Sequence, residues 1–405
     1  MNTPVLSGKI ARDIGVCSRC GGCKAVCPTY DDSPIESRSA RGRIMIVKGL
    51  LAGALQPDDA VCERIYSCTL CGACTGLCPL GIDIPEIIHA GRSFLRPSDR
   101  KRLFLRRAIR ISTRWPDMSL RLLRISRHLV LPALAKRGLI PFSPELPETT
   151  LRAADQVYTV PRKKGRVAVF AGCSVNFFLP SLGESLINVL QHLGYEVVLP
   201  KDEVCCGAPL RSLGLNDEAE AAARKNERVL NRLKVEAILS LCPTCTMNLR
   251  SEYPKIIGRR IDRIEDVSVF LQERIPAINP IGRSAVFHDP CHLAYGLGVK
   301  KEPRLLIAQS GLDLKEPEKT TCCGFGGTFC FSNREIADRL LAQQARNLLQ
   351  TGAGTVVTSC PGCMAYLGQA ITDRPVLHLI ELIEDAFCWR AGEAAAGPAK
   401  PVQAA

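Results

Sequence analysis

The chain of 405 residues is 46% hydrophobic and 23% charged, which is typical of a globular protein with roughly two to four domains. Its 21 cysteines are an odd number, and no charged segment followed by an apolar run opens the sequence. A disulfide framework and a secretion signal are therefore not indicated, and we expect a reducing, cytoplasmic location. The net charge of +13 is concentrated between Arg92 and Arg137, where fourteen Lys and Arg accompany two acidic residues. Aromatic residues make up only 5%, which gives little support to a nucleic-acid partner, and no apolar stretch predicts a transmembrane segment.

Residues 1–95 contain the same cysteine motif twice, 51 residues apart. Each copy has the spacing C-x2-C-x2-C-x3-C-P, which is typical of [4Fe–4S] clusters in bacterial ferredoxins, where the fourth cysteine binds the other cluster. Structural zinc usually takes two well-separated Cys-x2-Cys pairs. Iron–sulfur is therefore favoured, and we expect an α-helical ferredoxin-like domain with a helix over about 41–55. The predicted sets are Cys17, Cys20, Cys23 and Cys78 for cluster 1, and Cys68, Cys71, Cys74 and Cys27 for cluster 2.

Residues 96–160 contain no cysteine and carry most of the net positive charge, so we expect a basic helical linker. Such a segment can bind anionic lipid head groups, dock an acidic partner or simply form a solvated helical face. Nucleic acid is the weakest alternative, because no recognition motif accompanies the charge.

Residues 165–275 and 283–390 form an internal repeat, because five cysteines recur in the same order with offsets of 117 or 118 residues. In each copy an adjacent cysteine pair is followed by glycine, and a Cys-Pro-x-Cys pair comes later. The first set is Cys173, Cys205, Cys206, Cys242 and Cys245, and the second is Cys291, Cys322, Cys323, Cys360 and Cys363.

Strands and helices alternate in each copy, which favours duplicated α/β domains with small parallel sheets. Ser181 with Glu184 and Ser332 with Glu335 predict capping boxes for two of the helices. The cysteines fall at strand ends, where an open α/β sheet binds its ligands. We expect strands over 166–170, 195–199, 237–241, 284–287 and 355–358, and helices over about 181–194, 216–234 and 332–352.

The adjacent cysteine pairs are chemically unusual. Neighbouring side chains in an extended segment point apart, so each pair must occupy a sharp turn, which Gly207 or Gly324 permits. Five thiolates are one more than an ordinary cubane uses, which indicates an iron–sulfur site of unusual geometry or with one exchangeable cysteine. A zinc site and a metal-free dithiol of the thioredoxin type are the alternatives.

His288 and His292 flank Cys291 and are weak catalytic candidates, because a histidine beside a cluster can deliver protons. Packing or strand capping is the ordinary alternative. Cys62, Cys330 and Cys388 lie outside every motif, and we expect buried thiols there. The glycine-rich segment 324–327 follows a cysteine pair rather than a strand, so we predict no flavin or NAD site. Residues 391–405 are expected to be a disordered tail.

Over about residues 10–390 the chain resembles the iron–sulfur subunits of glycolate oxidase and related lactate-oxidising complexes, and the D-type subunit of heterodisulfide reductase. The resemblance rests on the paired ferredoxin motifs, on Arg41-Gly-Arg43 after Cys27-Pro-Thr-Tyr30, and on the two Cys-Cys-Gly repeats. It implies two cubane clusters followed by two CCG domains. The heterodisulfide reductase branch further implies a non-cubane [4Fe–4S] cluster at each complete five-cysteine set. Some glycolate-type members have lost cysteines from the first copy, whereas this chain keeps all ten, which favours the heterodisulfide reductase branch. Its length and domain layout favour the glycolate and lactate branch.

The resemblance implies the iron–sulfur electron-transfer subunit of an oxidoreductase that oxidises a 2-hydroxyacid, glycolate or lactate. An FAD-containing dehydrogenase subunit would be the partner, and electrons would pass toward quinone or a membrane-bound acceptor, with the complex at the inner face of the membrane. Two alternatives are a heterodisulfide reductase-like subunit that reduces disulfides at a CCG-bound cluster, and the iron–sulfur subunit of an anaerobic glycerol-3-phosphate dehydrogenase. A third is a zinc-stabilised scaffold behind a ferredoxin domain.

Overall fold

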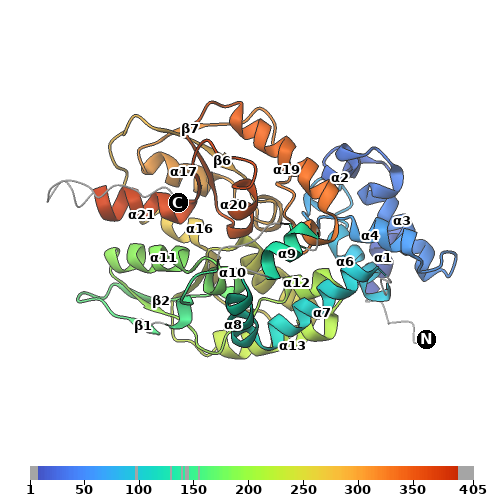
Figure 1. Ribbon diagram of the computed structural model, residues 1–405, viewed down its shortest axis with the longest axis horizontal. Coiled ribbons are helices and arrows are strands. Elements are labelled where there is room, and N and C mark those ends of the chain that lie inside the picture. The colour runs from blue at the N-terminus through green and yellow to red at the C-terminus, as the bar shows by residue number, and fades with distance from the viewer. Residues whose placement is uncertain are drawn as a thin grey trace.

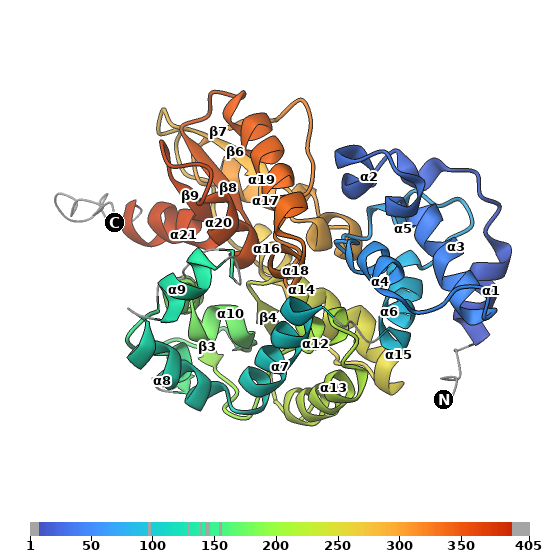
Figure 2. The same ribbon diagram turned by 45° about the vertical axis from the view of Figure 1, so that its right-hand side comes forward.

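The computed structural model describes residues 8–95, 99–127, 130–137, 140–141, 146–153 and 156–390. An α-helical N-terminal region, drawn in blue, packs against two α/β repeats, drawn in green to yellow and in orange to red (Figure 1). Figure 2 shows the blue region in contact with both repeats. The expected mixture of α and α/β domains is confirmed, while the tail predicted for 391–405 lies outside the described residues. Among the described helices, none has the length and apolar character required to span a membrane.

The N-terminal region is entirely helical, as expected. Its core is built from Ile44, Val47, Ile65 and Ile87, each at most 1% exposed. The helix expected over 41–55 ends earlier, at Leu51. The elements are α1 Gly8–Val16, η1 Gly22–Lys24, α2 Pro28–Asp32, η2 Glu36–Arg38, α3 Ala40–Leu51, α4 Asp59–Tyr66, α5 Ala73–Gly76 and α6 Ile84–Phe94.

The basic linker forms helices that run along the first α/β repeat. Leu105 of the first linker helix packs against Leu210 and Leu213, and Leu120 of the second packs against Phe177. The linker is therefore docked on the first repeat rather than free of it. Its elements are α7 Arg100–Arg114, α8 Pro116–Ser126, α9 Val130–Lys136 and η3 Leu151–Ala153.

The first repeat is a five-stranded sheet with the order β1-β3-β2-β4-β5. Its strands pair in parallel except for the short edge strand β1, which runs antiparallel to β3. The strands are β1 Val157–Tyr158, β2 Gly165–Val169, β3 Tyr195–Val198, β4 Ala237–Ser240 and β5 Ile264–Asp266. The helices are α10 Gly172–Phe177, α11 Pro180–His192, α12 Ala208–Ser212, α13 Asn216–Leu230, α14 Pro243–Met247, η4 Asn248–Glu252, α15 Tyr253–Ile257 and α16 Val267–Gln272.

The second repeat has the same parallel order, β7-β6-β8-β9, so the sheets confirm the duplication. Strands β1, β5, β7 and β9 were not expected from the sequence, because all are only two or three residues long. The strands are β6 Ser284–His288, β7 Asp313–Lys315, β8 Thr355–Thr358 and β9 Val376–His378. The helices are η5 His292–Leu297, α17 Lys301–Gln309, α18 Phe329–Ser332, α19 Arg334–Leu349, α20 Pro361–Leu367, α21 Leu379–Glu384 and η6 Asp385–Arg390.

Both predicted capping boxes are wrong. Helix α11 begins at Pro180, whose fixed φ suits the first helical position, so Ser181 already lies inside the helix. Helix α19 begins after Asn333, because Ser332 belongs to the separate short helix α18. In neither helix does the residue at the cap use its side chain.

The two repeats share one apolar core. Helix α11 of the first packs on α21 of the second, and α16 packs on α17, as the neighbouring green and red helices show in Figure 1. Buried residues from both repeats join in a single cluster, including Leu186 and Phe270 from the first and Leu306 and Ile380 from the second. Burial of this size is the main stabilising term in folding. It fixes the two sheets relative to each other.

Candidate iron–sulfur sites

The structure brings each predicted ferredoxin set together around one small cavity. Cys17, Cys20, Cys23 and Cys78 line the first cavity. Cys27, Cys68, Cys71 and Cys74 line the second. In both, the fourth cysteine comes from the other motif, which is the exchange that the ferredoxin spacing implies. The assignment of these cysteines as ligands stays a prediction, and the geometry is compatible with it.

The two motifs fold into the same unusual loop. Arg19 and Leu70 have φ angles of 59° and 58°, and Gly21 and Gly72 have φ angles of 85° and 79°. Non-glycine residues rarely adopt a positive φ, and such strain concentrates at functional sites. The repeated strain turns the first three cysteines of each motif toward one point.

A buried arginine stands beside the second cavity. Arg43 is 1% exposed, and it donates hydrogen bonds to Thr29 Oγ1 and to the carbonyl of Ser67, at 2.9 and 3.0 Å. Its Nη1 lies 3.9 Å from Cys27 Sγ. A Cβ on Gly42 would lie 2.0 Å from the carbonyl oxygen of Glu36. The Arg-Gly-Arg segment therefore needs glycine at its centre and places a positive charge against a predicted cluster ligand.

The cysteines that line the second cavity suit a positively charged group such as a metal cluster. Burial, followed by the nearby charge of Cys322, raises the pKa of Cys71 to about 12. Burial and the neighbouring thiols raise the pKa of Cys74 even further. Cys71 and Cys74 therefore stay protonated near neutral pH unless positive charge stabilises their thiolates, which is what metal ligation supplies. These residues suit a [4Fe–4S] cluster better than a metal-free site.

The ten cysteines of the two repeats form one unbroken series of side-chain contacts. Within the first set, the thiols lie close enough to influence one another in the order Cys173, Cys205, Cys206, Cys245 and Cys242. Within the second set, Cys323 Sγ donates to Cys363 Sγ at 3.1 Å, and the thiols influence one another in the order Cys360, Cys363, Cys323, Cys322 and Cys291. Cys242 also pairs with Cys360. Each predicted set is thus assembled, and the two sets meet at this pair.

Three of these thiols have lowered pKa values. Hydrogen bonds from Cys205 and Cys245 lower the pKa of Cys206 to about 6. Hydrogen bonds from Cys291 and Cys323 hold the pKa of Cys322 well below its usual range. Cys242 and Cys363 lower the pKa of Cys360 in the same way. Each set therefore contains at least one thiol whose pKa is lowered by its neighbours, which suits metal binding.

The turns after the adjacent cysteines are as predicted. Gly207 and Gly324 have φ angles of 87° and 85°, which an L side chain adopts only at a cost. Beside the Gly324 position, a Cβ would lie 2.3 Å from the carbonyl oxygen of Ala337. Glycine is therefore required there both by conformation and by space.

The sequence reasoning missed two buried amides that hold these loops. Asn226 accepts a hydrogen bond from the Val204 backbone and donates to the carbonyl of Cys205. Gln344 accepts one from the Thr321 backbone. Both side chains are fully buried, and they are 118 residues apart, the same offset as the cysteines. A polar amide on the apolar face of a helix, repeated at the duplication offset, was the signal that could have found them.

The two candidate histidines occupy different positions. A ring nitrogen of His288 lies within 4.8 Å of Cys323 Sγ and Cys363 Sγ, and Gln344 Nε2 approaches its Nδ1 at 3.2 Å. Burial lowers the pKa of His288 to about 4, so it is neutral near pH 7. His288 therefore adjoins the thiols of the second cysteine set.

His292 bridges three parts of the molecule. Its Nε2 lies 3.1 Å from the carbonyl oxygen of Leu70, in the loop of the second ferredoxin motif. Its Nδ1 lies 2.7 Å from Thr244 Oγ1, inside the Cys-Pro-Thr-Cys segment of the first repeat. Because a carbonyl only accepts, Nε2 donates to Leu70, and in the neutral form of the ring Nδ1 then accepts from the threonine hydroxyl. His292 itself follows Cys291 of the second repeat.

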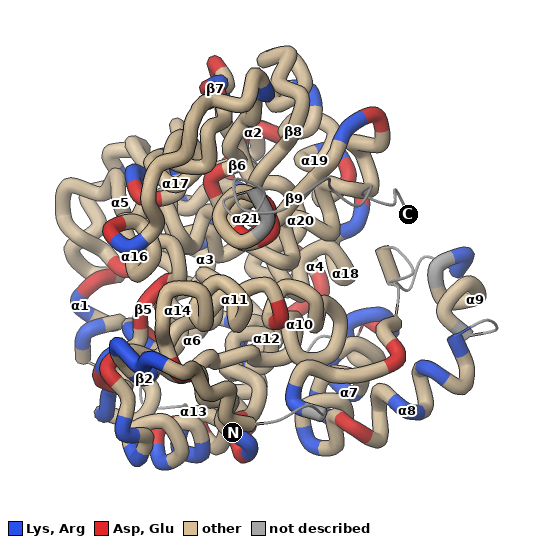
Figure 3. The backbone as a smooth tube through the Cα atoms, turned by 90° about the vertical axis from the view of Figure 1, so that its left-hand side faces the viewer, with Lys and Arg blue, Asp and Glu red and all other residues tan. Residues whose placement is uncertain are grey.

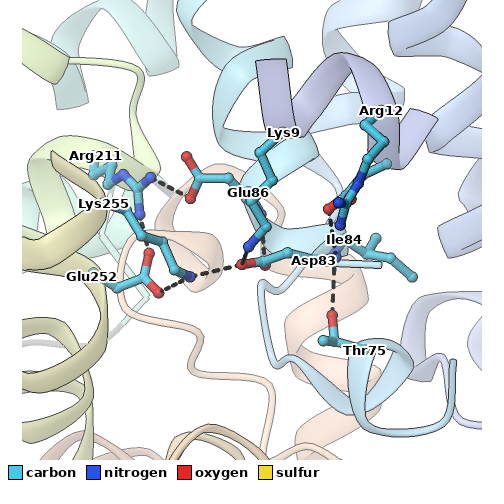
Figure 4. Close-up of polar contacts among 10 residues, drawn as sticks. Lys9, Arg12, Thr75, Asp83, Ile84, Glu86, Arg211, Glu252 and Lys255 are labelled. Atoms are coloured by element: carbon cyan, nitrogen blue, oxygen red, sulfur yellow. Dashed lines mark hydrogen bonds and ion pairs between the residues drawn. The ribbon is translucent and has the colours of Figure 1, made fainter. Parts of the chain in front are cut away.

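A buried ion-pair network fastens the ferredoxin domain to the first repeat. Arg211 lies between Glu86 of α6 and Glu252 of η4, and Lys255 joins Glu252 to Asp83 at 2.6 and 2.8 Å (Figure 4). The second cavity lies instead where the ferredoxin domain meets the second repeat, because Cys71 is close enough to Cys322 for their charges to interact. The predicted cluster 2 set therefore adjoins the second repeat.

Of the cysteines outside the motifs, Cys62 and Cys330 are buried, which confirms the expectation. Cys388 is only half-buried. Burial raises the pKa of Cys62, so it is an unreactive thiol near neutral pH.

Family comparisons agree with this arrangement. A model of the 4Fe-4S dicluster domain matches residues 13–82, and a model of the cysteine-rich CCG domain matches residues 167–250 and 285–368. The chain is therefore an iron–sulfur protein that joins a dicluster domain to two CCG domains. The predicted N-terminal [4Fe–4S] pair and the CCG duplication are confirmed at this level.

Among its relatives are oxidoreductase subunits of several kinds. It is 28% identical to the glycolate oxidase iron–sulfur subunit of Escherichia coli K12, over 92% of this chain and 93% of the relative. It is 24% identical to the D-type subunit of the dihydromethanophenazine:CoB–CoM heterodisulfide reductase of Methanosarcina barkeri, over 96% and 97%. It is 28% identical to one subunit of the CoM/CoB fumarate reductase of Methanothermobacter marburgensis, over 92% and 72%. The resemblance expected from the motifs is confirmed.

A solved structure shares the fold. A hypothetical protein from Helicobacter pylori superimposes with a TM-score of 0.57 at 11% identity, covering 96% of this chain and 74% of that one. At this identity the likeness concerns the fold alone.

Proposed function

We propose that this chain is the iron–sulfur subunit of a flavoprotein-linked 2-hydroxyacid dehydrogenase of the glycolate or lactate type, with the FAD on a partner subunit. The observation that carries the proposal is the series of cysteines that leads from the ferredoxin domain into both CCG domains. The sequence contains no dinucleotide-binding motif. Bound [4Fe–4S] clusters supply one-electron transfer, whereas oxidation of a hydroxyacid by hydride transfer needs an organic cofactor.

The two ferredoxin sets face different surroundings, which supports an electron-transfer role. Cys20 of the first set is exposed. Val16, Leu77 and Leu80, which adjoin this set, are each 48% exposed. Cys71 of the second set is buried toward the CCG cysteines. The chain thus offers one set to a partner and covers the other with its own repeats.

The test is to purify the complete complex anaerobically, to measure its flavin content and to follow its cluster absorbance after addition of a hydroxyacid. We expect one flavin to copurify and glycolate or lactate to bleach the cluster absorbance. Leu80→Glu should slow bleaching about tenfold, equivalent to about 1.4 kcal/mol in partner binding, while dithionite still reduces all clusters. Leu305→Glu, at a residue 46% exposed and remote from the ferredoxin sets, is the matched control. A complex without flavin, or one inert to both acids, would overturn the proposal.

A second candidate is reduction of disulfides in the manner implied by the heterodisulfide reductase relative. The contact between Cys242 and Cys360 favours it, because that contact joins two complete cysteine sets. Reduced viologen with a mixed disulfide of two small thiols is the assay. Disulfide-dependent oxidation of the dye, together with inertness toward hydroxyacids, would select this candidate over the first.

We further propose one additional [4Fe–4S] cluster in each CCG domain, held by the two five-cysteine sets. Iron near sixteen atoms per chain, about four clusters, supports this loading. Iron near eight with stoichiometric zinc would instead assign the CCG sets a scaffold role.

A further inference from the structure

The outer face of the linker is both basic and strongly apolar. Helices α7 and α8 bury Leu105 and Leu120 against the first repeat and turn the opposite faces to solvent. Seven large apolar side chains are exposed on this side, with Ile125 at 83%, Leu122 at 59% and Trp115 at 52% exposure. The others are Leu103, Phe104, Ile111 and Met118. An apolar surface of this extent is unusual on a soluble protein and marks an interaction site.

Arginines share the same faces at helical spacing. In α7, Arg107 and Arg114 lie three or four residues from Phe104 and Ile111, so they share one exposed stripe. In α8, Arg121 stands between Met118 and Ile125 in the same way. Figure 3 shows the positive segments of α7 and α8 along one edge of the molecule. Between residues 99 and 127, which the structure describes throughout, the only acids are Asp99 and Asp117.

We propose that α7 and α8 bind directly to the surface of an anionic phospholipid bilayer. A membrane interface accepts this mixture, because aliphatic and Trp side chains enter the acyl boundary while arginines reach the phosphate groups above it. An acidic protein would satisfy the arginines and leave the seven apolar side chains unexplained. Charge and apolar area together therefore select lipid.

Membrane binding through this surface would have a geometric consequence for the first CCG domain. The buried side of α8 packs with Leu120 beside Phe177, in the cluster that also contacts Cys173. Docking α8 on a bilayer therefore brings the first cysteine set close to the lipid surface. A lipid-soluble electron carrier would meet the chain on this side.

Flotation of the anaerobically purified, cluster-loaded chain with lipid vesicles tests the proposal. We expect binding to vesicles of phosphatidylcholine with phosphatidylglycerol, little binding to phosphatidylcholine alone, and release at high salt. Ile125→Glu and Arg114→Glu should each weaken binding about tenfold or more. The protein contains two tryptophans, Trp115 and Trp389, so in a Trp389→Phe variant lipid-induced changes of fluorescence report on Trp115.

Two exposed positions elsewhere serve as matched controls. Leu305→Glu introduces the same charge on the second repeat, and Arg232→Glu reverses a charge beyond α13. Iron content and circular dichroism of every variant show whether it is folded. The proposal is overturned if the wild type does not float with anionic vesicles, or if Ile125→Glu and Arg114→Glu float like their controls. Loss of a copurifying protein from these two variants, with no lipid binding by the wild type, would assign the surface to a protein partner instead.

Discussion

The ion pairs between the ferredoxin domain and the first repeat lead to a quantitative prediction. Replacing Arg211 by Met removes the cation that lies between Glu86 and Glu252. The side chain of Arg211 is 8% exposed, and those of the two glutamates are 17% and 13% exposed. The charges are therefore largely desolvated, and removing one partner of such a pair typically destabilises by about 3–5 kcal/mol.

The structure narrows this range. Glu252 keeps Lys255 at 2.6 Å, whereas Arg211 provides the only ion pair of Glu86 among the described residues. Because Glu86 retains some contact with water, we expect a loss of about 3 kcal/mol for Arg211→Met. Adding Glu86→Gln neutralises the orphaned carboxylate and should recover about 2 kcal/mol of that loss.

Urea titrations of the anaerobic holoprotein, followed by circular dichroism and cluster absorbance, measure these differences. Arg224→Ala breaks an exposed pair with Glu220, whose side chains are 54% and 43% exposed, and should change stability by less than about 1 kcal/mol. The network does not stabilise the interface if Arg211→Met lowers the urea midpoint no further than this control does. The same conclusion follows if the double variant loses as much stability as the two single variants added together.

Three further changes have directional outcomes. Gly324→Ala should lower the thermal midpoint more than Gly207→Ala. Both variants lose about 1 kcal/mol to a left-handed φ, but the new Cβ would lie 2.3 Å from a carbonyl oxygen at position 324 and 3.4 Å from one at position 207. Equal shifts of the midpoint would refute the steric argument. Burial raises the pKa of Asp266 from 3.8 to about 6, so the folded state holds this proton more tightly and the wild type loses about 3 kcal/mol of stability as pH rises through that window. Asp266→Asn should therefore stabilise the protein at pH 7 and not at pH 4 in unfolding titrations, and a benefit independent of pH would contradict this. His292→Phe removes the hydrogen bonds to Leu70 and Thr244, so amide exchange in the loop 68–74 should accelerate, and unchanged exchange would show that the bridge does not hold the loop.

Much of the site could be predicted because its cysteines occur in short motifs with characteristic spacings. The C-x2-C-x2-C motif places three thiols on one tight loop, and the glycine after each adjacent cysteine pair reports the left-handed turn directly. The offset of 117 or 118 residues predicted two equivalent domains, and the order of the four parallel strands is the same in both sheets.

Contacts between distant segments could not be predicted in this way. The pairing of Cys242 with Cys360 depends on how two sheets pack, which no local pattern encodes. The partners of His292 come from the ferredoxin domain and the first repeat. The capping boxes failed because local residues matched a motif while Pro180 and the short helix α18 set the true boundaries. Strands of two or three residues, such as β5 and β9, are too short to show a period.

The apolar core shared by the two repeats means that the duplicated unit is not a pair of interchangeable modules. A fragment ending near residue 280 would leave the faces of α11 and α16 uncovered, and such surfaces drive aggregation. We therefore expect folding to be cooperative across the duplication, so that neither copy folds alone. The same fact allows evolutionary freedom in the two cysteine sets, because aliphatic side chains rather than cysteines hold the sheets together. We expect that one copy can lose cysteines without losing the architecture.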